Sequence, residues 1–284
     1  MLLIIILLEV SLCSNKQHMS YINKGQCIFC SRNSSETKFT EKPHTMPKSL
    51  GSISIGVDIC NECNHYFGEP DLLAKPNLCI EVCVKEIFGL IRHLIITEKA
   101  KQEEKKLERL KSIYFEYWES KQKIVIKSTF KYNTAFLKVF TNQFKRGIYE
   151  MFLQEYHKET GNGLDSRFNE IREYARYNKG NIPLYYVQNS RGILFIDNNI
   201  SSPKFHFSPA QFEDIDNYGF YTLIILGQWF YLEVTPRAKL CRDIYLRNEA
   251  KKVLGTGFVF NSIIEISTIT DIDFTLRNLY GGKK

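Results

Sequence analysis

The sequence contains no apolar run long enough to cross a membrane. A spanning helix needs roughly 20 consecutive apolar residues. The stretch Tyr221-Thr-Leu-Ile-Ile-Leu-Gly-Gln-Trp-Phe-Tyr-Leu232 covers only about 12 and predicts a pair of buried strands instead. We therefore expect no membrane partner.

The first residues lack the features of a secretory leader. The apolar residues 1–13 have no positively charged start, are interrupted by Glu9 and fall short of a spanning length. Met19 begins a sequence suited to a cytosolic start. We interpret residues 1–18 as an extension or a disordered leader, with an export signal as the alternative.

Other patterns are also missing. The turn Gly255-Thr-Gly257 lacks the lysine and the following helix of a phosphate-binding loop, and no repeat or low-complexity tract occurs. The 284 residues are 44% hydrophobic and 24% charged, which is typical of a globular protein with room for two domains. A net charge of +7 favours a polyanionic partner.

Two Cys-x-x-Cys pairs dominate the N-terminal part of the chain. They are Cys27-Ile-Phe-Cys30 and Cys60-Asn-Glu-Cys63. Four thiolates on two turns can surround one ion, and sulfur ligands favour Zn²⁺ in a closed site without an open position. We predict a structural zinc that stabilises a module too small for a sufficient core, in the reducing cytoplasm. The alternative is four ordinary buried cysteines.

His44 is the only histidine between the two cysteine pairs. A neutral imidazole can take a proton from water near pH 7, as a general base attacking a phosphodiester must. Lys42 and Lys48 lie on the same segment and are candidate phosphate contacts. The alternatives are a surface or core histidine at position 44 and solvated lysines at positions 42 and 48.

Two motifs resemble the HNH endonucleases. The motifs are His44-Thr-Met-Pro-Lys-Ser-Leu-Gly51 and Cys60-Asn-Glu-Cys-Asn64-His65-Tyr-Phe-Gly68, and they are similar to the treble-clef branch with paired cysteines over residues 26–92. The resemblance implies a ββα-metal nuclease that hydrolyses DNA. In it His44 activates water, and Asn64 replaces the last histidine of the family name as a ligand of Mg²⁺ or Mn²⁺. We expect His65, one position further on a helix, to point elsewhere.

The chain departs from the family pattern at two places. Pro43 stands where the family has an acidic metal ligand, and we expect Glu41, on the same face of a strand, to supply the carboxylate. The asparagine that orients the base in the family has no clear match before the second cysteine pair, where the polar residues are Ser52, Ser54 and Asp58. A catalytically inactive, zinc-stapled module that binds nucleic acid or protein is therefore the alternative function.

The remaining sequence predicts helices followed by strands. Residues 53–59 alternate as in a half-buried strand, and a helix follows from Asn61. Residues 97–111 predict a mixed-charge helix, residues 113–118 and 123–127 predict strands, and an aromatic stripe predicts a core helix from Asn133 to Gly161. Residues 165–177 predict another helix, and we expect its arginines to form a basic row or to pair with Glu170 and Glu173.

Beyond residue 181 strands dominate the prediction. The expected strands are residues 183–188, 192–196, 221–234 and 257–267, arranged as an antiparallel sheet with helices on one side. The predicted fold is α+β: a zinc-stapled ββα-metal module at residues 19–95, a charged helical connector at 96–130 and an α+β domain at 131–284. For the last domain three roles stay open, namely positioning substrate, binding a partner protein and forming a homodimer.

Overall fold

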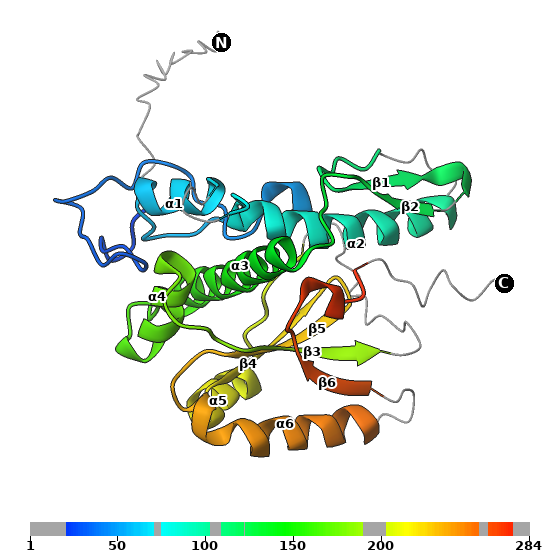
Figure 1. The fold of residues 1–284 in the computed structure, drawn as a ribbon. Coiled ribbons are helices and arrows are strands. Elements are labelled where there is room, and N and C mark those ends of the chain that lie inside the picture. Colours follow the sequence, from blue (N-terminus) through cyan, green and yellow to red (C-terminus); the bar gives the residue numbers. More distant parts are fainter. Residues whose placement is uncertain are drawn as a thin grey trace, which may run out of the picture.

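The computed structural model describes residues 21–70, 75–102, 109–121, 123–189, 203–255 and 261–274. Within these ranges the fold is α+β, as predicted, with six α-helices, one two-stranded sheet and one four-stranded sheet, both antiparallel (Figure 1). The elements in chain order are η1 (Lys48–Leu50), α1 (Asn61–Gly68), α2 (Ile80–Gln102), β1 (Phe115–Trp118), η2 (Glu119–Lys121), β2 (Lys123–Ile126), α3 (Thr134–Thr160), η3 (Ser166–Phe168), α4 (Asn169–Tyr177), β3 (Leu184–Asn189), α5 (Pro209–Tyr218), β4 (Phe220–Ile225), β5 (Gln228–Glu233), α6 (Ala238–Gly255), β6 (Asn261–Glu265) and η4 (Ile269–Asp271).

The segment before α1 is largely irregular. The predicted strand at residues 53–59 is wrong, because only one isolated antiparallel bridge, between His44 and Ile55, forms there. Ile53 is 81% exposed, and Asp58 turns the backbone with a φ of 57°. Hydrogen bonds to the Asp58 carboxylate, and not a ladder of strand hydrogen bonds, determine the backbone conformation here. The helix predicted from Asn61 is confirmed as α1.

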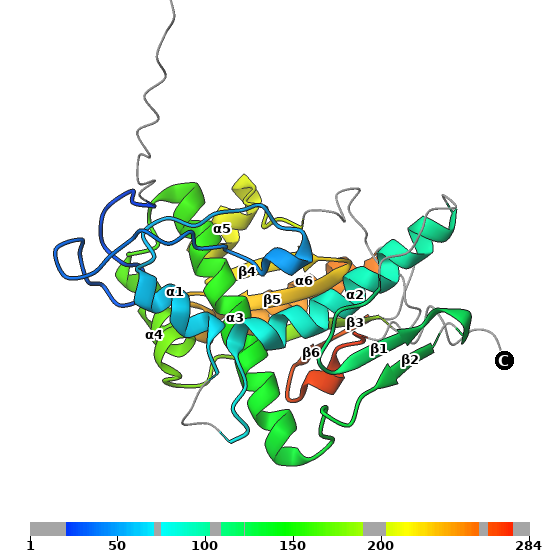
Figure 2. The same ribbon diagram turned by 90° about the horizontal axis from the view of Figure 1, so that it is seen from above.

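Helix α3 is the centre of the molecule. The Asn133 side chain accepts a hydrogen bond from the N–H of Phe136 at its start, and Gly161 ends it in the left-handed conformation with a φ of 72°. The predicted apolar stripe is confirmed as buried core: Phe136, Phe140, Phe144, Ile148, Phe152 and Tyr156. Helix α2 crosses α3 on one side, as Figure 2 shows from above, and the four-stranded sheet packs on another.

The four-stranded sheet is covered by helices on both faces, which corrects the prediction of helices on one side. Its strand order is β4-β5-β3-β6. Phe230 packs toward the α2 and α3 face, 6.1 Å from the ring of Phe88, whereas its neighbour Tyr231 packs with Tyr245 of α6 on the opposite face. Side chains alternate between faces along a strand, so both faces are apolar and both need cover.

Helices α5 and α6 were not predicted by the sequence analysis. They occupy stretches between the predicted strands, with α5 beside β4 and α6 against the sheet (Figure 1). The predicted strands at 183–188 and 221–234 are confirmed as β3 and as β4 with β5. Residues 192–196 lie outside the described residues, and within 257–267 the described strand is β6.

One hydrophobic core extends through the described chain from Cys27 to Phe274. It joins the cysteine segment, α2, α3 and the α3-facing side of the sheet. Residue 96, where the connector was predicted to begin, lies inside α2, which continues to Gln102; residues 109–111 of the predicted charged helix are not helical. The division into domains stays a prediction. Among the described helices, none has the length and apolar character that a membrane crossing requires.

Candidate functional site

Four cysteine sulfurs meet at the N-terminal end of the molecule. Cys27 and Cys30 lie on a tight turn closed by the hydrogen bond from the Ser31 N–H to the Cys27 carbonyl, while Cys60 caps α1 and Cys63 lies in its first turn. The four Sγ atoms lie within 4.8 Å of one another. A tetrahedral site with metal–sulfur bonds of about 2.3 Å places its sulfurs about 3.8 Å apart. The Cys30 and Cys60 sulfurs are 3.6 Å apart, so the cluster can hold a structural metal ion.

Charged and backbone donors surround this cluster. Arg32 donates Nε to Cys30 Sγ at 3.4 Å, and Arg176 of α4 donates Nε to Cys63 Sγ at 3.3 Å. A dication with four thiolates would leave two negative charges, which two guanidinium groups can balance. Hydrogen bonding among the four sulfurs lowers the pKa of Cys30 and Cys60 and raises that of Cys27 and Cys63, so a bound metal would have to displace the protons that the cluster shares.

The basic row predicted on residues 165–177 is wrong, and so is the alternative that these arginines pair with Glu170 and Glu173. Arg172 is buried and donates to the carbonyl of Ile28 at 2.6 Å. Arg176 reaches the cysteine cluster, and Arg167 pairs with Asp216 of α5 at 2.6 Å. Each guanidinium is used in packing against another segment, because the arginines lie between α4 and its neighbours.

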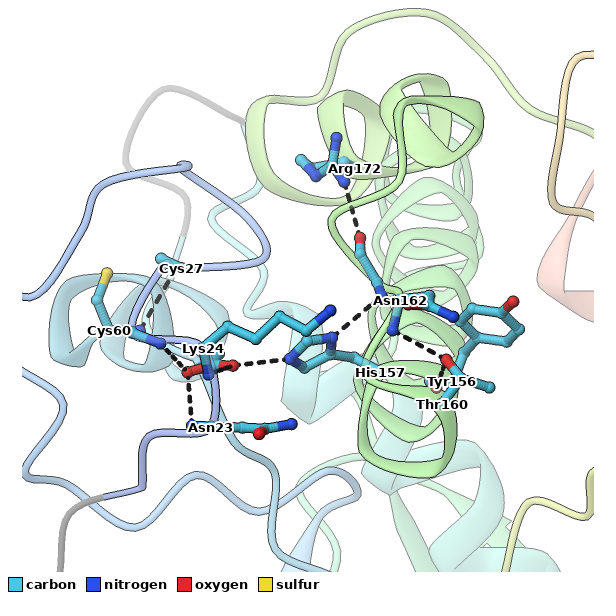
Figure 3. A network of polar contacts seen from close by, with 12 residues as sticks. Asn23, Lys24, Cys27, Cys60, Tyr156, His157, Thr160, Asn162 and Arg172 are labelled. Carbon is cyan, nitrogen blue, oxygen red and sulfur yellow. Dashed lines mark hydrogen bonds and ion pairs between the residues drawn. The ribbon is translucent and has the colours of Figure 1, made fainter.

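A buried carboxylate–imidazole pair fixes the chain around the cysteines. The Asp58 carboxylate accepts backbone N–H bonds from Asn23, Lys24 and Gly25, and it lies 2.9 Å from Nε2 of His157 on α3. The other ring nitrogen of His157 accepts the N–H of Gly163, so Nε2 carries the proton donated to Asp58 (Figure 3).

Both members of this pair are fully buried. Burial alone would raise the pKa of Asp58, but the hydrogen bonds from the Lys24 N–H and from His157 outweigh burial and lower that pKa. Asp58 is therefore used structurally, holding the loop before Cys27 against α3.

A pocket of about 380 Å³ contains most of the predicted catalytic residues. Five residues singled out in the sequence line it: Lys42, His44, Lys48, Asn64 and His65. Nδ1 of His44 is buried and has no hydrogen-bond partner among the described residues. Burial, followed by the charges of Lys42 and Lys48, lowers the pKa of His44, so its ring is neutral near pH 7.

Glu41 lies beside this pocket without lining it. Its Oε2 accepts a hydrogen bond from Nδ2 of Asn64 at 3.4 Å and lies 2.6 Å from Nε2 of His65. The expectation that His65 points elsewhere is therefore wrong: Asn64 and His65 both line the pocket, and the Glu41 side chain reaches both near the end of the short helix α1.

Two carboxylates that were not predicted from the sequence line the same pocket, Glu81 of α2 and Glu150 of α3. Part of the Glu81 side chain is exposed, but desolvation by the surrounding protein still raises the pKa of its carboxyl group. Burial, followed by the charge of Glu81, raises the pKa of Glu150 well above its ordinary value. Two acids close enough for the charge of one to raise the pKa of the other are favourable neighbours for a cation, which would stabilise their ionised forms.

Helix packing explains how these two acids meet. Gly147 lies where α3 crosses α2, and a Cβ there would stand 2.3 Å from Cγ2 of Val84. Glu150 follows Gly147 by three positions and Glu81 precedes Val84 by three, about one turn in each case. No local sequence signal predicts this meeting, because it depends on the crossing of two helices.

Comparisons with known proteins do not assign this site. A scan against protein-family models, a search of curated proteins and a search of solved structures each returned no match.

Proposed function

We propose that this protein is a metal-dependent endonuclease that hydrolyses DNA phosphodiester bonds, with a zinc ion held by Cys27, Cys30, Cys60 and Cys63 as a structural staple. One observation carries the proposal. The pocket beside the cysteine cluster is lined by the half-buried ring of His44 together with Asn64 and two carboxylates. The motifs around His44 and Asn64 that resemble HNH endonucleases support the same reaction.

In this proposal His44 is the general base. Its lowered pKa keeps the imidazole neutral at pH 7, and the half-buried ring lines the pocket, where it would take a proton from a water molecule. Lys42 and Lys48, which line the same pocket, would contact the phosphates on either side of the scissile bond. The phosphodiester would then lie beside a neutral imidazole that can accept a proton.

The oxygen donors of the pocket suit a Mg²⁺ or Mn²⁺ ion. Glu41 accepts Nδ2–H of Asn64, which turns the amide so that Oδ1 is left as a hard donor. Glu81 and Glu150 would add carboxylate oxygens, in place of the acidic ligand that Pro43 removes. A divalent cation bound by these groups would stabilise the charge that develops on the phosphate.

A catalytically inactive module that binds nucleic acid or protein is the second candidate. It is favoured by the burial of Pro43, which offers no ligand, and by the engagement of Glu41 with Asn64 and His65. In that case the cysteine cluster and the basic residues would serve recognition alone.

Plasmid cleavage separates the two candidates. Supercoiled plasmid is incubated with the purified protein and Mg²⁺ or Mn²⁺, alongside His44→Ala and the control His206→Ala, which changes an exposed histidine that does not line the pocket. We expect His44→Ala to lose about 10²-fold or more in rate while His206→Ala cuts normally. Cutting that survives in His44→Ala would refute the base assignment, and DNA binding without cutting by any protein would favour the second candidate.

A further inference from the structure

A second and larger groove lies next to the His44 pocket. It measures about 690 Å³ and lies between η1, α2 and residues 109–111. Four of its lining residues are cationic: Lys85, Arg92, Arg109 and Lys111. Among the described residues that line it there is no Asp or Glu, so a net positive field is expected inside.

The groove has a helical floor. Lys85, Gly89, Arg92 and Ile96 follow one another at spacings of four and three along α2, which places them on one face. Gly89 contributes no side chain, and a Cβ built there would meet only Leu50 Cδ2 at 3.9 Å. The floor is therefore open between two cationic side chains.

The opposite wall is held in place by a buried carboxylate. Glu86 of α2 is 2% exposed and accepts hydrogen bonds from the Ser112 hydroxyl and from the N–H groups of Ile113 and Tyr114. These bonds fix the chain that carries Arg109 and Lys111 against α2. They also occupy the Glu86 oxygens, so this acid does not pair directly with the cationic side chains, and its single negative charge offsets only part of theirs.

The two cavities are joined by neighbouring residues of η1. Lys48 lines the His44 pocket and Ser49 lines the cationic groove, while η1 packs against α2. A chain of phosphates that leaves the pocket at Lys48 therefore meets Ser49 and then the four cationic side chains. A concave, one-signed groove of this kind fits a polynucleotide backbone better than a flat membrane surface.

We infer that this groove binds the phosphate backbone of a nucleic acid whose scissile bond lies in the His44 pocket. The inference rests on the proposed function for the identity of the substrate. The contacts are with phosphates only, so the groove sets the position of the strand and adds affinity without reading sequence.

The test is DNA binding with the chemistry disabled. A fluorescein-labelled duplex is titrated with His44→Ala protein, without added divalent metal, at several salt concentrations. The groove variant carries Lys85→Gln and Lys111→Gln. The matched control carries Lys204→Gln and Lys251→Gln, two exposed lysines that line none of the cavities described here.

We expect the groove variant to bind at least about tenfold more weakly and its log–log salt slope to fall by about 2, with the control unchanged. Equal losses in groove variant and control, or no DNA binding by the parent protein, would overturn the inference. So would a variant that loses binding to phosphatidylserine vesicles while keeping its affinity for DNA.

The outcome is separable from that of the proposed function. A groove variant with weakened DNA binding, in a protein that never cuts plasmid, would support the groove and refute the nuclease. Plasmid cleavage by the parent protein, with unchanged DNA binding in the groove variant, would support the nuclease and refute the groove. Thermal unfolding midpoints of all variants are compared first, to show that each variant is folded. We expect them to be equal, because none of the substituted lysines belongs to the buried core.

Discussion

His44 stands in surroundings that disfavour its protonated form. Its ring is half-buried, and two lysines of the same segment, Lys42 and Lys48, line the pocket with it. Burial is the larger cause of the lowered pKa, and the lysine charges add to it. A base of this kind stays neutral to a lower pH than a free histidine does.

Removing the lysine charges should move the titration of His44 upward. In Lys42→Gln with Lys48→Gln the repulsion of the imidazolium is removed, so we predict that the pKa of His44 rises but stays below its ordinary value because burial remains. The acid limb of any cleavage profile should shift to higher pH with it. Ring proton shifts in NMR measure the pKa directly, with His44→Ala identifying the signal.

The control for this titration is Lys204→Gln, an exposed lysine that does not line the pocket. It should leave the His44 signal unchanged. A pKa that falls in the double variant, or that moves equally in the control, would contradict the electrostatic account of this pocket.

At the scale of elements, the crossing of α2 and α3 determines the pocket. Gly147 lets the two helices approach so closely that Val84 and Ile80 fill the space where a side chain would lie. Glu81 of α2 and Glu150 of α3 line the pocket together with Val84 and Gly147 of this crossing. Any change that separates the helices should therefore affect both stability and the spacing of the two acids.

Gly147→Ala is predicted to destabilise the protein by about 1–3 kcal/mol, because the new Cβ would stand 2.3 Å from Val84 Cγ2 in a packed core. Helix propensity alone would give a gain of up to about 1 kcal/mol. The matched control is Gly89→Ala in α2, where the nearest atom is 3.9 Å away, and it should be neutral or stabilising. Unfolding in guanidinium chloride measures both; equal effects would contradict close packing at Gly147.

The elements that were predictable from the sequence are those with local signals. Helix α3 has a long apolar stripe and a Gly161 stop, and both act as predicted; its Asn133 cap is a further local signal. Helix α5 also begins with a local signal, Ser208-Pro209-Ala-Gln211, which forms a capping box that the sequence analysis overlooked. Helix α6 has a weaker pattern, since Leu240 is 88% exposed and Ile244 is 59% exposed.

The candidate site divides in the same way. The cysteine cluster was predictable because a paired spacing is itself a local signal, and His44 and Asn64 were found through short motifs. Glu81 and Glu150 were not predictable, because their proximity depends on how helices α2 and α3 pack. The failure of the strand at residues 53–59 has a similar cause, since the contacts of Asp58 with distant residues determine that backbone.

At the scale of the whole molecule, the cysteine cluster is tied to the helical core by several contacts. Arg176 of α4 binds Cys63 and stacks over the Tyr66 ring at 3.8 Å, and the buried Arg146 of α3 donates to the Tyr66 hydroxyl. Asp58 and His157 form a further link to α3. Because the hydrophobic core also continues from the cluster to the sheet, we expect the described chain to unfold as one unit.

Zinc release and unfolding of the sheet should therefore coincide. The chain has two tryptophans, Trp118 on β1 and Trp229 on β5, so Trp118→Phe leaves a single fluorescent reporter in the sheet. We predict that purified protein carries about one zinc per chain. In guanidinium chloride, the change in Trp229 fluorescence and the release of metal to a chromogenic chelator should share one midpoint. Cys63→Ala should lower both the zinc content and that midpoint. The control Cys241→Ser, outside the cluster, should change neither. Zinc lost well before the Trp229 transition would contradict this coupling and would favour separate domains on either side of residues 96–130.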